Sequence, residues 1–159
     1  MRWRFADKVL AFAPWQAIVT LKAGSLEEYS LLDRWGSPGQ APAILTLEAC
    51  IQSARWLVEA SSAFSQTIEP LEISRWQVMA GLRPGERLRV RLRVTSHSAE
   101  RIGFHAWQDR LLPGQTDAGP GARPHAADEP DMDFSAALTP LAGHCLPADR
   151  ACSWRELTA

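Results

Sequence analysis

The sequence lacks several features that would place it in a specialised class. Its three cysteines are an odd number and form no Cys-x-x-Cys pair, which argues against a disulfide framework or a zinc site. No apolar stretch approaches the ~20 residues of a membrane helix, and the apolar run near the N-terminus is too short for a signal peptide. We therefore expect a cytoplasmic protein that does not enter a membrane.

An excess of charge is also missing. Seventeen Lys and Arg residues against 18 Asp and Glu residues give a net charge of -1. A nearly neutral chain has no overall attraction to nucleic acid or to an acidic membrane surface. The four histidines show no ligand-like spacing. The sequence therefore predicts no nucleic-acid partner, no metal site and no cofactor.

What the sequence does contain is enough apolar material for one core. The chain has 159 residues, of which 46% are hydrophobic, so we expect a single domain over residues 1–159. Seven tryptophans stand against one tyrosine. Large aromatic rings fill cores or line apolar clefts, so this bias alone favours no particular function.

Runs of β-forming residues predict strands on both sides of one helix. The alternation of Leu and Val with Arg in "RLRVRLRV", after a Pro84-Gly85 turn, indicates a half-buried strand with apolar side chains inward and arginines outward. An arginine-rich outward face is typical of a protected sheet edge. The expected strands cover residues 7–12, 17–23, 68–79, 87–94, 100–109 and 132–142.

The segment 42–60 predicts a long helix, with Pro42 well placed at its start. Apolar residues cover most of its circumference, which is typical of a helix wrapped by other elements. Its polar residues fall on one narrow stripe: Glu48, Gln52, Arg55 and Glu59. Glu48 is open to two interpretations, as one member of a solvated stripe or as a carboxylate that points into a cleft.

The remaining segments are irregular by composition. Ser25 and Glu28 form a capping-box pattern that predicts a short helical turn. Residues 110–131 are dense in Pro, Gly, Ala and Asp and predict a long loop, and Pro147 can begin a short terminal helix over 147–157. The order of elements indicates an α+β domain with one antiparallel sheet wrapped around a long central helix.

Three stretches in this order resemble one family, the hotdog-fold β-hydroxyacyl-acyl-carrier-protein dehydratases. "DKVLAFAPWQAIVTLKAGSLEEY" is similar to the family's opening hairpin, "PAILTLEACIQSA" to its central helix, and "ISRWQVMAGLRPGERLRVRLRV" to its later hairpin. The resemblance covers about residues 5–108. It implies a hotdog fold and an acyl thioester, carried on phosphopantetheine, as the ligand.

The resemblance also implies a site, and the chain departs from it at one position. The family's carboxylate falls on Glu48, but Arg34 stands where the family has its loop histidine. Asp33, Trp35, Gly36 and Ser37 replace the neighbouring Gly, Phe, Pro and Gly. Arginine stays protonated at any usable pH, so Arg34 can bind an anion but cannot take the α-proton as imidazole does.

The implied site residues are Glu48 as the catalytic group and, at the substrate, Arg34, Trp35, Ala43, Ile44 and Gln52. The N–H groups of Ala43 and Ile44, at the start of the helix, would polarise the thioester carbonyl. Glu48 would protonate the leaving hydroxyl, and burial would raise its pKa for that role.

Three functional hypotheses follow. In the first, the chain is a dehydratase-like subunit, homodimeric or paired with a His-bearing hotdog chain that completes a shared site around Glu48. In the second, it is a hotdog thioesterase in which Glu48 activates water or attacks the thioester. In the third, it binds an acyl thioester or its carrier without turning it over. The carrier can be an acyl-carrier protein or coenzyme A.

Overall fold

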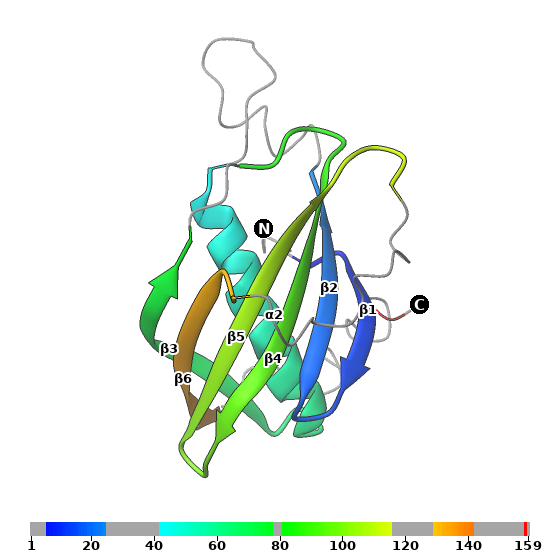
Figure 1. Ribbon diagram of the computed structural model, residues 1–159. Coiled ribbons are helices and arrows are strands. Elements are labelled where there is room, and N and C mark those ends of the chain that lie inside the picture. The colour runs from blue at the N-terminus through cyan, green and yellow to red at the C-terminus, as the bar shows by residue number, and fades with distance from the viewer. Residues whose placement is uncertain (1–5, 25–41, 78–80, 116–128, 142–157, 159) are drawn as a thin grey trace.

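A computed structural model describes residues 6–24, 42–77, 81–115, 129–141 and 158. The described chain forms one sheet and one helix (Figure 1). The helix α2 spans Ile44–Ser61. The strands are β1 (Lys8–Ala13), β2 (Ala17–Ala23), β3 (Gln66–Trp76), β4 (Arg87–His97), β5 (Arg101–Leu111) and β6 (Met132–Pro140).

All strand pairs in the six-stranded sheet are antiparallel, in the order β1-β2-β4-β5-β6-β3. The helix follows β2 in the chain and packs across one face of the sheet, which we call the inner face (Figure 1). Strand β3 then crosses to the far edge and pairs with β6. The edges of the described sheet are therefore β1 and β3.

Alternation along the strands separates the two faces of the sheet. Ile102, Phe104 and Ala106 of β5 are buried in the core with α2, so the residues between them point to the opposite, outer face. A buried hydrogen bond of 2.7 Å between the hydroxyls of Thr20 and Ser53 ties the helix to the inner face of β2. One apolar layer between α2 and the sheet is thus the core.

The strand predictions are confirmed in number, order and direction, with ends that shift by up to three residues. The Pro84-Gly85 turn is also confirmed. Gly85 has φ +82°, a conformation that glycine adopts without strain, and its N–H donates to the carbonyl of Gly24 at 3.1 Å. The turn therefore fixes where β4 begins beside β2.

The helix predicted over 42–60 begins and ends later, at Ile44 and Ser61, and has 18 residues. At 1.5 Å per residue that is about 27 Å, so it is a helix of ordinary rather than unusual length. It covers the inner face of the sheet. The predicted turn near Ser25, most of the predicted loop and the predicted helix over 147–157 lie outside the described residues.

The interpretation of the arginines as edge protection was wrong. Strand β4 lies in the interior of the sheet between β2 and β5. Arg89 and Arg91 do point to the outer face, but they are buried rather than solvated. Alternation identified their face, whereas their burial depends on what packs beside them, which a strand pattern does not contain.

Candidate functional site

The start of α2 presents unpaired backbone donors. Ala43 caps the helix without a side-chain hydrogen bond, and the first turn holds no acidic residue. The N–H groups of Leu45 and Thr46 donate to the carbonyls of Pro42 and Ala43 at 2.9 and 3.0 Å. Within the described chain no hydrogen bond uses the N–H of Ala43 or of Ile44. This end of the helix therefore carries partial positive charge and two donors for an oxygen ligand.

Glu48 lies one turn further along, on the same side of the helix as Ile44, because residues four apart share a face. Its side chain is half-buried, and Ile44 is 54% exposed. Gln52 follows on the same side and is half-buried with contacts of its own. The structure thus brings together four of the predicted site residues: Ala43, Ile44, Glu48 and Gln52.

The polar stripe does not stay solvated along its length. At its far end Glu59 is fully buried, and its carboxylate accepts a hydrogen bond of 2.7 Å from the hydroxyl of Thr67 on β3. The solvated-stripe interpretation is therefore wrong for Glu59. Glu48, by contrast, is neither dry nor fully exposed.

Arg34 and Trp35, with the rest of the 33–37 loop, lie outside the described residues. Of the four histidines, the structure describes His97 and His105. His97 stacks on Trp15 with ring centroids 4.6 Å apart, and the backbone N–H of Trp15 donates to the hydroxyl of Ser61 at the end of α2. His97 therefore lies near the opposite end of the helix from Glu48. His105 points to the outer face, away from the helix, where its Nε2 is 3.3 Å from Asp133.

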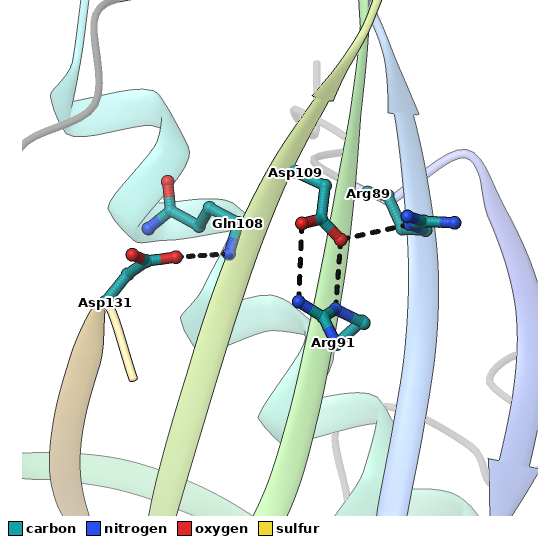
Figure 2. A network of polar contacts seen from close by, with 5 residues as sticks. All are labelled: Arg89, Arg91, Gln108, Asp109 and Asp131. Carbon is teal, nitrogen blue, oxygen red and sulfur yellow. Dashed lines mark hydrogen bonds and ion pairs between the residues drawn. The ribbon is translucent and has the colours of Figure 1, made fainter. Parts of the chain in front are cut away.

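A polar cluster beneath the helix was missed by the sequence reasoning. Cys50 of α2, Gln108 of β5 and Asp131, just before β6, lie close together. The backbone N–H of Gln108 donates to Oδ2 of Asp131 at 2.6 Å (Figure 2). The amide of Gln108 reaches Cys50, yet neither of its polar side-chain atoms makes a hydrogen bond of normal geometry. The available signal in the sequence was that Gln108 lies two residues after Ala106 and therefore on the same, inner face of the strand.

The pKa of the Cys50 thiol is raised to about 12, mainly by burial and then by the charge of Asp131, while the contact with Gln108 lowers it. A thiol with such a pKa is protonated at neutral pH and is not a nucleophile. Cys50 also lies two positions from Glu48, on the sheet-facing side of the helix. The cluster is therefore structural, and Glu48 is the described carboxylate of α2 that keeps part of its surface exposed.

On the outer face Asp109 holds the two buried arginines of β4. Its Oδ2 is 3.1 Å from Nε of Arg89 and 2.9 Å from Nε of Arg91 (Figure 2). The guanidinium of Arg91 also lies over the ring of Trp107, 5.9 Å from its centroid. The network balances the buried charge and explains why these arginines form no free basic surface.

No group of three or more His, Cys, Asp or Glu residues in the described chain is arranged to hold a metal ion. The described part of the chain also contains no helix with the length and hydropathy needed to cross a membrane.

Comparison with known proteins places the fold. No protein-family model and no curated protein sequence matches the chain. Among solved structures, the smu.793 protein of Streptococcus mutans UA159, bound to acetyl-CoA, is similar with a TM-score of 0.56 and 12% identity, covering 88% of this chain and 94% of that one.

Two further structures are similar. A hypothetical thioesterase of Streptococcus pneumoniae TIGR4, with coenzyme A, has a TM-score of 0.53 and 12% identity over 84% of this chain and 85% of that one. Zebrafish thioesterase superfamily member 2 has a TM-score of 0.50 and 11% identity over 84% and 79%. At such identities the likeness concerns the fold. The chain has the hotdog fold that these three structures share.

Proposed function

We propose that the chain binds an acyl thioester of coenzyme A at the start of α2 and hydrolyses it with Glu48. The observation that carries the proposal is the pairing of a half-buried carboxylate with two unpaired N–H groups one turn before it on the same helix. Two of the structurally similar proteins hold coenzyme A or acetyl-CoA, which supports a thioester as the ligand.

The chemistry uses both parts of this arrangement. The thioester carbonyl oxygen accepts hydrogen bonds from the N–H groups of Ala43 and Ile44, which stabilise the charge that develops on it. Glu48 takes a proton from a water molecule that attacks the carbonyl carbon. The carbon–sulfur bond then breaks, and the proton goes to the leaving thiolate, so the products are the free acid and the thiol.

The placement of the described histidines favours hydrolysis over dehydration by this chain alone. Removing the α-proton of a 3-hydroxyacyl thioester needs a base near Glu48. His97 lies near the far end of the helix and His105 on the outer face, so neither reaches Glu48. His125 and His144 lie outside the described residues.

The second candidate is a shared-site dehydratase, and the free edge of the sheet favours it. Strand β3 pairs only with β6 among the described strands, and it exposes Leu71 at 51% and Ile73 at 41%. An unpaired edge strand that exposes two large apolar side chains fits pairing with another hotdog chain. A His-bearing partner seated there would supply the base, while Glu48 would protonate the leaving hydroxyl.

We expect this edge to form a dimer. An Ile73→Lys substitution should shift the chain toward the monomer in sedimentation velocity, because a buried ammonium group at the interface is costly. Glu100→Gln, in the turn between β4 and β5, is the matched control and should leave the oligomeric state unchanged. A wild-type chain that is monomeric at every concentration tested would remove the dimer from the proposal.

One set of assays separates the candidates. In the first assay the purified chain is given acyl-CoA thioesters of increasing length, and the release of free thiol is measured. In the second it is given a 3-hydroxyacyl thioester, alone and with a His-bearing hotdog subunit, and the enoyl product is measured. Thiol release that is lost in Glu48→Gln and kept in Glu100→Gln supports the hydrolase. Enoyl product in the mixture only supports the shared-site dehydratase.

Silence in both assays would overturn both catalytic proposals. If adding acyl-CoA then changed the fluorescence of half-buried Trp56 on α2, the chain would be an acyl-thioester binding subunit. This outcome would support the third hypothesis, binding without turnover.

A further inference from the structure

The outer face of the sheet contains a concavity that no residue of α2 lines. It has a volume of about 350 Å³ and is lined by residues of β3, β4, β5 and β6. His105 and Asp133 are register partners there, as are Gly103 and Ser135. The cavity therefore lies across four neighbouring strands, on the face that α2 does not cover.

Irregular pairing and a missing side chain create this space. The register of β4 against β5 shifts between Val94 and Ser96, and that of β3 against β6 shifts between Pro70 and Glu72 and again between Ile73 and Arg75. A Cβ at Gly103 would lie 2.6 Å from Oγ of Ser96 and 2.8 Å from Oγ1 of Thr95. The glycine thus keeps these two hydroxyls open toward the cavity.

The lining is rich in hydrogen-bond acceptors. Glu72 and Asp133 supply carboxylates, and Ser74, Thr95, Ser96 and Ser135 supply hydroxyls. Oδ1 of Asp133 is buried and accepts no hydrogen bond of normal geometry, although Nε2 of His105 is 3.3 Å away. Because that atom is closed to solvent, a ligand would contact the rest of the carboxylate, whose side chain is 29% exposed.

The charges around the cavity indicate a cationic ligand. Glu72 is exposed and has no basic partner in the described chain, whereas Arg75, the register partner of Asp133, is bonded to Glu129. Arg93 pairs with His105 in the register but does not line the cavity. In the described chain no group of three metal-type ligands exists, so an organic cation fits better than a metal ion.

The geometry points to a binding site for a small organic ammonium ion whose neighbouring groups donate hydrogen bonds, as in a short polyamine or an amino sugar. The ammonium group lies between Glu72 and Asp133, and the hydroxyls of β4 and β6 accept from the adjacent donors. A volume of about 350 Å³ is at the small end of ligand pockets. The site is independent of the thioester chemistry proposed for Glu48.

The test uses the full chain labelled with ¹⁵N, titrated with putrescine and with glucosamine. Their neutral counterparts, 1,4-butanediol and N-acetylglucosamine, are the ligand controls. We expect the amide signals of Gly103 and Ser135 to shift with at least one amine and with neither control. Absence of these shifts with both amines, or equal shifts with the neutral controls, would overturn the proposal.

Two variants locate the ammonium group. Glu72→Gln and Asp133→Asn should each weaken amine binding roughly tenfold, because each removes a charge-assisted hydrogen bond. Glu69→Gln, an exposed carboxylate on the same strand, is the matched control and should not change binding. If Asp133→Asn fails to fold, Glu72→Gln decides alone, and unchanged affinity in it would refute the site.

Discussion

The two ends of α2 differ in how far they bury a glutamate side chain. Glu48, near the beginning, is half-buried with no ion pair in the described chain, while Glu59, near the end, is fully buried and bonded to Thr67. Both lie on one stripe of the helix. The return of the chain into β3 closes the far end, whereas no element of the described chain closes the near end, where Glu48 stays half-buried.

Closure at the far end has visible structural causes. After Ser61 the chain turns sharply, with Ala63 and Phe64 both at positive φ, and the N–H of Phe64 donates to the carbonyl of Glu59 at 2.6 Å. The hydroxyl of Ser62 donates to the same carbonyl at 3.2 Å. This tight turn brings Thr67 against the carboxylate. An open carboxylate is available for chemistry, and a closed one serves the fold.

The largest expected effect is on activity at the open end. Glu48→Gln should lower thioester hydrolysis about a thousandfold, because an amide cannot accept the proton of the attacking water. Its urea midpoint should stay near that of the wild type, since the side chain is half-buried and isosteric. Steady-state thiol release measures the activity, and equilibrium unfolding in urea measures the stability. A Glu48→Gln protein with wild-type activity would show that Glu48 is not the catalytic base.

Cys50, on the sheet-facing side of α2, should make the free energy of unfolding depend on pH. Because the folded pKa of Cys50 is raised from 9.0 to about 12, the native state holds the thiol proton that the unfolded chain loses. The free energy of unfolding should therefore fall between pH 9 and 11, by about 2–3 kcal/mol more in the wild type than in Cys50→Ala. If the free energy of unfolding depended on pH in the same way in both proteins, the thiol of Cys50 would not have a raised pKa in the folded state.

At the closed end the expected effect is on stability. Glu59→Ala should destabilise the fold by about 2 kcal/mol, because it leaves the Thr67 hydroxyl without its acceptor and opens a cavity. Glu59→Gln keeps an acceptor oxygen and should cost less. Urea unfolding gives both values, and normal kcat in each protein is the check that Glu59 has no part in catalysis.

The smallest effect concerns the other half of that hydrogen bond. Thr67→Val should cost about 1 kcal/mol, near the net value of one hydrogen bond. Combined with Glu59→Ala it should cost less than the sum of the two, since both remove the same contact. Additive costs in this double-mutant cycle would mean that Glu59 is held by its other contacts.

The fold was predictable because its signals are local. Alternation over "RLRVRLRV", the Pro84-Gly85 turn and the apolar helix are each readable from neighbouring residues, and the six strands and the helix lie near the predicted segments. The burial of Arg89 and Arg91 was not, because it depends on Asp109 and Trp107 of the next strand. The cluster of Cys50, Gln108 and Asp131 also joins three distant segments.

The candidate site divides in the same way. The positions of Ile44, Glu48 and Gln52 on one side of the helix follow from spacing alone, because four-residue steps share a helix face. Ala43 directly precedes them as the N-cap. The predicted roles of Arg34 and Trp35 stay predictions, since those residues lie outside the described chain. The outer cavity has no counterpart in any sequence motif, because its lining is gathered from four strands.

The amino-acid sequence by itself determined the elements, their order and the side of the helix on which Glu48 lies, because periodicity and turn chemistry act over a few residues. Tertiary structure alone decided which carboxylate of that stripe is closed and which is open. It also decided that the arginine-rich strand lies inside the sheet. Both outcomes depend on contacts between segments far apart in the chain, where burial and pairing are established together.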